Sequence, residues 1–233
     1  MEITCMSFNT QHCLNYITRQ IDFDRMADTI RDCGADVIGL QEIRGQGDRP
    51  DYADQAKILA EKLGFYYYFA EAIRIGGTNP YGNAILSRYP ITAAQTVPIP
   101  DPLYKKYTGH YETRCVLKAA LDIGLTVLVG HFGLNPDERK KAVKTVVRHL
   151  EKERCVLMGD FNMEPDNRIL RPIRRRLWDT AEKFPEPRYS FPSDDPTQKL
   201  DYIYVTDDLQ VYSADIPAIV ASDHRPHLAT IGL

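Results

Sequence analysis

Short apolar runs recur along the chain, separated by polar turns or by amphipathic segments. An uninterrupted apolar run of about four to eight residues is typical of a strand that is buried on both faces. Buried strands are therefore predicted over residues 3–8, 37–40, 65–69, 84–86, 91–97, 115–121, 125–129, 155–158, 200–205, 209–212 and 227–231.

Three other segments repeat apolar residues every three or four positions, which is the period of an amphipathic helix. The first helix is predicted to begin after Asp22, a favourable N-cap, and to end at Gly34. The second is predicted between Asp51 and Gly64. The third follows Asn135 and has a proline at its first position and acids in its first turn.

Two segments that contain glycine or proline, residues 76–82 and 98–112, are predicted to be loops. The strands alternate with helices along the chain, which places the protein in the α/β class. Because no low-complexity linker interrupts this order, a single domain over residues 1–233 is predicted.

The composition is that of a packed globular protein. Hydrophobic residues make up 43% of the 233 positions and charged residues 26%. A formal net charge of -3 and a pI of about 6.1 do not favour binding to long nucleic acid, which usually requires a broad basic surface. The local basic cluster of Arg171 and Arg174–Arg176 is interpreted as a solvated helix face.

The five cysteines, at positions 5, 13, 33, 115 and 155, are odd in number, scattered and mostly set in apolar runs. This pattern is unlike a disulfide framework or a zinc site, so reduced core residues are predicted. The chain opens directly into a predicted strand, without a basic and apolar leader, and it has no apolar run of membrane-spanning length. A cytoplasmic location is therefore expected.

Polar side chains follow several of the predicted strands. They are Asn9, Glu42, His131, Asp160 with Asn162, and, after the final loop, Asp223 with His224. Strand ends converge in α/β proteins, which build their ligand sites there. Singly, each residue has an ordinary explanation as a turn cap, a surface acid or a buried histidine. Together they predict a catalytic cluster, because several buried carboxylates without a metal or hydrogen bonds would be strongly destabilising.

These residues belong to short motifs spread over nearly the whole chain. The motifs are Ser7-Phe8-Asn9, Leu40-Gln41-Glu42, Gly82-Asn83-Ala84-Ile85-Leu86-Ser87, Gly130-His131, Gly159-Asp160-Phe161-Asn162, Leu200-Asp201-Tyr202-Ile203 and Ser222-Asp223-His224-Arg225-Pro226. In this order the chain resembles the endonuclease/exonuclease/phosphatase superfamily, which includes deoxyribonuclease I, AP endonucleases, inositol polyphosphate 5-phosphatases and neutral sphingomyelinases. The resemblance implies a four-layered α/β sandwich, in which two mixed sheets pack face to face and helices cover the outside.

The resemblance further implies a magnesium-dependent hydrolase of phosphate esters, with Mn²⁺ as a possible substitute. Glu42 would bind the ion, assisted by Asn9. Magnesium suits such a site because it accepts few carboxylates and keeps waters that substrate oxygens can replace. Asp160 would deprotonate the attacking water, while the Asn162 amide would hold the water or a phosphate oxygen in line for displacement.

Histidines and their partners complete the implied site. His224 would donate a hydrogen bond to the phosphate in the transition state, with Asp201 as its orienting partner. Asp223 would assist either the metal or this network. His131 groups the chain with the deoxyribonuclease-, sphingomyelinase- and 5-phosphatase-like members, and it would either protonate the leaving oxygen or bind phosphate. Asn83 would line the same pocket.

Three further residues bear on the substrate. AP endonucleases carry an acid two residues after the first motif asparagine, and this chain has Gln11 there, so cleavage at abasic sites is not expected. Arg114 opens a strand, and its guanidinium is either a bidentate contact for substrate phosphate or a strand-edge charge. The same two roles are open for Lys199.

Three functions remain open on the sequence alone. The first is a phosphodiesterase or phosphatase for a small-molecule or lipid-headgroup phosphate, favoured by the acidic balance and the histidine branch. The second is a magnesium-dependent nuclease, which would use the same catalytic residues. The third is a non-catalytic binding module, against which the complete acid, amide and histidine set argues. Residues 104–111 could stack on bases, clasp a headgroup phosphate or form an ordered surface loop. A monomer is the default expectation.

Overall fold

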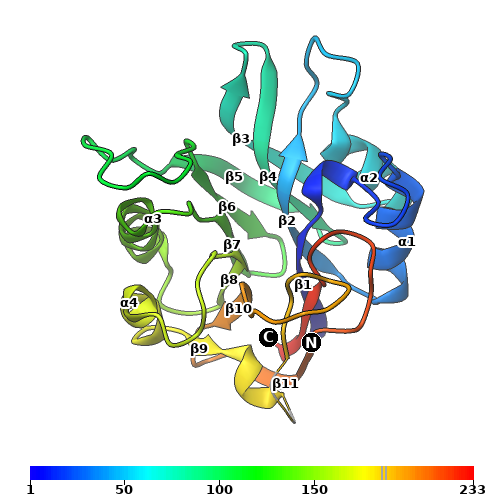
Figure 1. The fold of residues 1–233 in the computed structure, drawn as a ribbon. Helices are drawn as coiled ribbons and strands as arrows, with labels where there is room; N and C mark the ends of the chain where they lie inside the picture. The colour runs from blue at the N-terminus through cyan, green and yellow to red at the C-terminus, as the bar shows by residue number, and fades with distance from the viewer. Residues whose placement is uncertain (185, 187) are drawn as a thin grey trace.

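Two mixed β-sheets lie at the centre of the computed structural model, which describes residues 1–184, 186 and 188–233 (Figure 1). The first sheet contains, in spatial order, β11 (Gln210–Asp215), β12 (His227–Gly232), β1 (Glu2–Asn9), β2 (Val37–Arg44), β4 (Asn79–Ser87) and β3 (Tyr66–Ile75). The second contains β5 (Ile91–Pro98), β6 (Cys115–Leu121), β7 (Thr126–His131), β8 (Cys155–Asp160), β10 (Asp201–Val205) and β9 (Trp178–Asp179). β1 runs parallel to β2 and β7 runs parallel to β8.

Helices cover the outer faces of both sheets. On the right in Figure 1, over the first sheet, lie α1 (Phe23–Asp32) and α2 (Gln55–Leu63). On the left, over the second sheet, lie α3 (Pro136–His149) and α4 (Arg171–Arg174). Short 3-10 turns form η1 (Gln11–Cys13), η2 (Arg168–Leu170) and η3 (Thr180–Lys183). The fold is therefore the four-layered α/β sandwich that the motifs predicted.

Three apolar layers hold the four structural layers together, and β1 shows how one strand serves two of them. Its alternate residues Ile3 and Cys5 pack between the sheets, while Met6 and Phe8 pack under the helices of the first sheet. All four side chains are buried. Burying one such large apolar side chain contributes about 1.5–3 kcal/mol. Burial on both faces explains why the strands are uninterrupted apolar runs in the sequence.

The second helix begins later than the sequence predicted. Asp54, and not Asp51, accepts a hydrogen bond from the backbone nitrogen of Lys57 at 3.2 Å and caps α2. Asp51 instead forms an ion pair with Arg44, 2.8 Å away. The prediction was wrong because a capping aspartate and an ion-paired aspartate look the same in the sequence.

The predicted loop over residues 76–82 is mostly a strand, because β4 begins at Asn79 and pairs with β3 along its whole length. Gly82 is the reason for the misinterpretation. A Cβ atom at this position would lie 2.0 Å from the carbonyl oxygen of Ala70 on β3. The glycine therefore permits a close approach of two strands rather than a turn.

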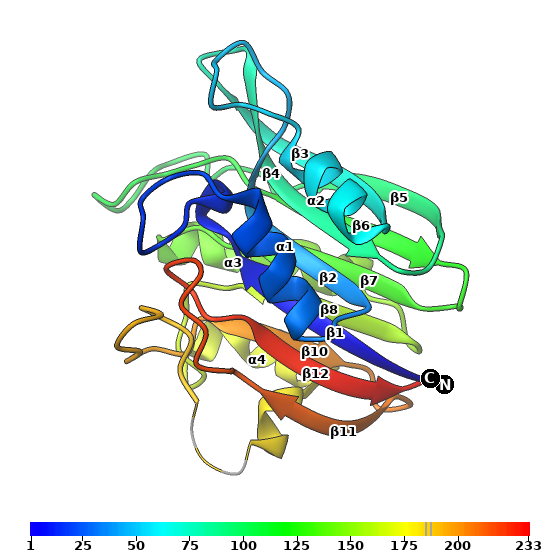
Figure 2. The same ribbon diagram turned by 90° about the vertical axis from the view of Figure 1, so that its right-hand side faces the viewer.

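The predicted state of the cysteines is confirmed. Cys5, Cys13, Cys115 and Cys155 are buried, Cys33 is half-buried, and all five are free thiols. Within the described part of the chain, no helix combines the length and the apolar character needed to cross a membrane. Figure 2 shows the two chain ends side by side, at the ends of β1 and β12.

Candidate active site

The predicted polar residues converge because of the register between neighbouring strands. β8 lies between β7 and β10, and its last residue, Asp160, is paired with His131 on one side and with Asp201 on the other. In the first sheet, Asn9 ends β1 beside the segment of β2 that carries Glu42. A hydrogen bond of 3.1 Å from Asn9 Nδ2 to Asp160 Oδ2 joins the two sheets at this point.

Asn9 links two carboxylates. Its Nδ2 donates to Glu42 Oε1 as well as to Asp160 Oδ2, each at 3.1 Å, and its Oδ1 accepts from the backbone nitrogen of Gln11 at 3.1 Å. Glu42 has a φ of 60° and lies at an irregularity in the pairing of β2 with β4. Such bulges re-aim side chains, and strained backbone of this kind concentrates at functional sites.

Asp160 is held at the centre of the site. Its carboxyl group is almost fully buried, and Oδ1 accepts a hydrogen bond of 2.8 Å from the backbone nitrogen of Asn162. Burial raises the pKa of Asp160 to about 7, even though the charge of His224 opposes the shift. A carboxylate with a pKa near the working pH is well suited to accept and release a proton.

Gly159, the residue before Asp160, is a requirement of the packing. A Cβ atom there would lie 1.9 Å from the carbonyl oxygen of Gly130, and its φ of 152° is rarely adopted by other residues. The glycine in this motif therefore lets β7 and β8 bring His131 and Asp160 together.

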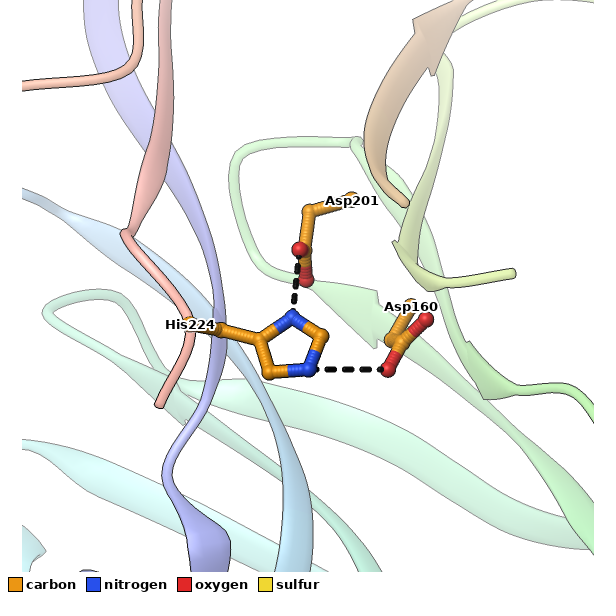
Figure 3. Close-up of side chains that lie close together, drawn as sticks. All are labelled: Asp160, Asp201 and His224. Carbon is orange, nitrogen blue, oxygen red and sulfur yellow. Dashed lines mark hydrogen bonds and ion pairs between the residues drawn. The ribbon is translucent and has the colours of Figure 1, made fainter. Parts of the chain in front are cut away.

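His224 lies between two acids (Figure 3). Its Nδ1 is 2.8 Å from Asp201 Oδ2, and its Nε2 is 3.6 Å from Asp160 Oδ2. Burial by itself lowers the pKa of His224, but Asp201 and Asp160 more than offset this effect and raise the pKa to about 10. The ring is therefore an imidazolium ion at neutral pH.

The backbone of Asp201 is fixed from behind. Its carbonyl oxygen accepts a hydrogen bond from Lys199 Nζ and is also 3.2 Å from Nδ1 of the buried His227. The ammonium group of Lys199 also lies 3.4 Å from the centroid of the Tyr202 ring, and the residue is 5% exposed. Lys199 is thus buried behind the site, with Asp201 and Tyr202 as its partners. It is not placed to meet substrate phosphate, which was one of the two roles that the sequence left open.

His131 has a cation behind it instead of an acid. Its Nε2 is 3.6 Å from Asp160 Oδ2, while its Nδ1 lies 2.6 Å from Arg114 Nη1. A guanidinium group can only donate hydrogen bonds, so Nδ1 must accept and the ring hydrogen must be on Nε2. Burial, together with the charges of Arg114 and His224, holds the pKa of His131 well below its ordinary value. His131 is therefore neutral.

Arg114 itself has two partners within the protein. Nη1 contacts His131, and Nη2 is 3.2 Å from Glu112 Oε1. Its side chain is only 13% exposed. The structure thus places Arg114 behind His131, and a direct contact with substrate phosphate stays a prediction.

Two asparagines predicted for the site differ in their surroundings. Asn162 follows Asp160 and donates Nδ2 to the carbonyl oxygen of Phe132 at 2.9 Å, which leaves its second amide hydrogen free. Asn83 is 2% exposed and donates Nδ2 to the carbonyl oxygen of Cys115 at 3.0 Å, so it ties the first sheet to the second. Its predicted role in substrate binding remains a prediction.

The residues proposed for magnesium offer hard oxygen donors, which is what that ion requires. Burial raises the pKa of the Asp223 carboxyl, and the charge of Glu42 raises it further, so the two acids are electrostatic neighbours. Burial and Glu42 likewise raise the pKa of Tyr81. A negative charge shared by two partly buried acids fits a divalent cation, and Asn9 helps by fixing Glu42.

A second group of possible ligands consists of Asp160, Asp201 and His224, whose ligand atoms lie within 4.8 Å of one another. This spacing is compatible with a metal ion. An ion bound by His224 Nδ1 and Asp201 Oδ2 would have to replace the hydrogen bond of 2.8 Å between these atoms, because a protonated ring nitrogen has no lone pair to offer a metal. This hydrogen bond favours proton handling by these residues, a role that remains a prediction.

Three neighbours of the site were not expected from the sequence. Glu112 supports Arg114, and Tyr81 lies near Glu42. Arg139, on α3, donates Nε to the carbonyl oxygen of Gly133 at 3.0 Å, and Asp160 is close enough to oppose the lowering of its pKa by burial. The helix cap at Asn135, four residues after His131, was a signal that this turn of α3 would lie at the site.

Comparison with known proteins agrees with the fold. A family model described as the Endonuclease/Exonuclease/phosphatase family matches residues 6–224. Among solved structures, an endonuclease/exonuclease/phosphatase from Beutenbergia cavernae is 22% identical, with a TM-score of 0.80 over 100% of this chain and 72% of that one. A mannosyl-6-phosphatase from Bacteroides thetaiotaomicron is 16% identical, with a TM-score of 0.75 over 99% and 100% of the two chains. The 2′,3′-cyclic phosphatase ANGEL2 is 16% identical, with a TM-score of 0.73 over 99% and 95%.

No curated protein matched the sequence. The match of the family model nevertheless spans most of the chain, and the chain therefore belongs to the endonuclease/exonuclease/phosphatase family, as its motifs predicted. It is accordingly a hydrolase of phosphate esters. The identities to the solved structures are low, so their likeness to this chain concerns the fold.

Proposed function

We propose that this protein is a magnesium-dependent phosphodiesterase or phosphatase that acts on a small-molecule or lipid-headgroup phosphate. An Asp160-activated water would attack the phosphorus in line. The main support is that one oxygen, Asp160 Oδ2, lies 3.6 Å from the Nε2 atoms of both His131 and His224. A base and two hydrogen-bond donors thereby surround one point in space.

The protein residues divide the reaction between them. As the water oxygen bonds to phosphorus, one of its protons passes to Asp160. The bond to the leaving oxygen breaks, and that oxygen departs with the bonding electron pair and takes up a proton from solvent. The His224 imidazolium donates Nε2–H to the phosphate as negative charge builds up. His131 donates Nε2–H to the phosphate as a neutral ring and keeps its proton, because losing it would create an anion. Asn162 holds the water or a phosphate oxygen with its free amide hydrogen.

Glu42 and Asp223 would hold the magnesium ion, with Asn9 fixing Glu42. The ion, when bound, supplies positive charge to a non-bridging phosphate oxygen. Manganese would be a possible substitute, since it also prefers oxygen ligands.

A small substrate is supported by the charge of the protein. The net charge is -3, and Arg114 is already paired with Glu112. Arg139 is a further half-buried cation near Asp160, and it would add a phosphate contact suited to a small, highly charged ester.

A nuclease is the second candidate, and one observation favours it. The loop that precedes β6 exposes Leu103 (91%) and Tyr104 (79%) next to Lys105 and Lys106. Exposed aromatic and basic side chains can bind single-stranded nucleic acid. Part of this loop is nevertheless engaged in its own packing, since Tyr111 donates its hydroxyl to Asp137 at 2.9 Å.

A substrate panel tests the proposal. Bis-p-nitrophenyl phosphate, p-nitrophenyl phosphate, sphingomyelin, inositol phosphates and single- and double-stranded nucleic acids would be compared with magnesium, with manganese and with a chelator. We expect turnover of small esters that a chelator abolishes and added magnesium restores. Degradation of nucleic acid at substoichiometric enzyme, with no turnover of the small esters, would establish the nuclease instead.

Three further properties belong to the same proposal. The chain would act as one domain and as a monomer, and it would work in the cytoplasm. The presence of five free cysteines supports a reducing compartment.

A further inference from the structure

A groove of about 590 Å³ is lined by residues of α3 and of the segment formed by η2, α4 and the residues directly after α4. In Figure 1, α3 and α4 lie one above the other on the left of the molecule. The apolar lining of the groove comes from Val143, Val147, Ile169 and Pro172. The volume is within the range of about 300–1,000 Å³ that is usual for ligand sites. None of the residues placed in the catalytic site lines it.

The rim of this groove is entirely basic. It consists of Lys140, Lys144 and Arg148 on α3 and of Arg168 and Arg176 on the opposite wall, all exposed. Over residues 1–184, 186 and 188–233, no carboxylate lies within 4.0 Å of any of these five cations. The three on α3 are spaced four residues apart, an arrangement that places like charges side by side and destabilises a helix.

On the opposite side of the molecule, three of the four cations of α1 and α2 are paired with a carboxylate, and among the described residues Arg25 is the exception. On α1, Arg31 is paired with Asp28, and on α2, Lys57 is paired with Glu61, 3.8 Å away. Lys62 of α2 is 2.6 Å from Asp24 of α1. The uncompensated charge is therefore a local property of the α3–α4 groove and not of the helical layers in general.

We propose that the α3–α4 groove binds an acidic amphipathic helix of a partner protein. Its apolar stripe would lie on Val147 and Ile169, and its flanking carboxylates would meet the two basic walls. Helix-in-groove recognition uses this combination of apolar anchors and charged flanks. The groove is long enough for it, because Lys140 and Arg148 are about 12 Å apart along α3 at 1.5 Å per residue.

The distribution of charge distinguishes this occupant from two others. A single lipid headgroup would place its charge at one end of the groove, whereas the cations line both walls along its length. A nucleic-acid backbone would meet the cations, but it would leave the apolar lining without a partner. An acidic amphipathic helix matches both the basic walls and the apolar lining of the groove.

Fluorescence anisotropy with a defined probe tests the proposal. The probe is a labelled synthetic helix with leucines at positions i, i+3, i+4 and i+7 and glutamates on both flanks. A scrambled peptide of the same composition, anionic phosphatidylglycerol vesicles and a DNA oligonucleotide are measured in parallel. We expect saturable binding of the probe that is at least about tenfold tighter than binding of the scrambled peptide.

Paired charge reversals locate the binding. The variant Lys144→Glu with Arg168→Glu should weaken binding of the probe by about tenfold or more, because both walls lose a cation. The control Arg25→Glu with Lys57→Glu makes the same charge change at exposed positions of α1 and α2, and it should bind like the wild type. Thermal melting confirms that both variants are folded.

Three results would overturn the proposal. They are equal affinity for the probe and the scrambled peptide, equal weakening by the groove variant and the control, and binding of vesicles or DNA in place of the probe. Hydrolysis of a generic phosphate ester should be the same in both double variants and in the wild type, since neither changes the catalytic site.

Discussion

The two histidines of the site are alike in position and opposite in chemistry. Both are buried, and both place Nε2 at 3.6 Å from the same oxygen of Asp160. His224 has a carboxylate on its far nitrogen and is charged, whereas His131 has a guanidinium group there and is neutral. The partner behind an imidazole ring therefore decides its protonation and thereby what the ring can do for the reaction.

The largest effect is expected from changing Asp160, the acid that lies near both histidines. Asp160→Asn should lower kcat on bis-p-nitrophenyl phosphate by on the order of a thousandfold, because an amide cannot accept the proton of water. The change in volume is small, so the melting temperature should fall little. Unchanged turnover would contradict the role of Asp160 as the base that lies between the two histidines.

Removing each ring separately measures the difference between the histidines. His224→Ala should lower kcat by on the order of a hundredfold or more, the usual scale for losing a transition-state donor. His131→Ala should cost about tenfold, because a neutral donor contributes less than a charged one. Steady-state kinetics of both variants would decide. Equal losses, or an effect of His224→Ala confined to KM, would count against the assigned roles.

Changing the acid behind His224 should alter the pH dependence of the reaction. In the wild type, His224 keeps its proton up to a pKa of about 10, so the donor is present throughout the neutral range. Asp201→Asn removes a charge that raises this pKa while burial still lowers it. The ring therefore loses its proton at lower pH, and the alkaline limb of the kcat profile should move to lower pH, with a loss of about tenfold near neutrality.

The exposed Asp122 offers a matched control for this change. Asp122→Asn removes the same charge on the turn between β6 and β7, and its pH profile should match that of the wild type. A profile for Asp201→Asn that also matches the wild type would show that Asp201 does not control the protonation of His224.

The smallest expected effect concerns the cation behind His131. Arg114→Met removes a charge that lowers the pKa of His131 and the donor that fixes its tautomer, so this pKa should rise. Activity should fall a few-fold at neutral pH, where part of the neutral ring carries its hydrogen on Nδ1 and has none on Nε2 to donate, and it should fall less on the acid side, where the doubly protonated ring keeps Nε2–H. Nitrogen-15 NMR of the histidine rings should show the Nε2–H tautomer in the wild type and a mixture in the variant. Arg114→Lys keeps a donor and should restore much of the tautomer preference.

Much of the fold could be predicted from the sequence because the relevant signals are local. Strands buried on both faces, such as β1 and β8, appear as apolar runs, and the cap at Asn135 marks the start of α3. The signals failed where one residue type serves two purposes. Asp51 is an ion-pair partner and not a cap, and Gly82 permits strand contact and not a turn.

For the candidate site, too, one part could be predicted from the sequence and another could not. The ordered motifs along the chain were enough to predict the family, the four-layered fold and the set of acids, amides and histidines. Only the tertiary structure placed Arg114 behind His131 and Lys199 behind Asp201, whereas the motifs already implied Asp201 as the partner of His224. Protonation depends on burial and on the charge a few ångströms away, and both are set by how the strands and loops pack, which residue order alone does not show.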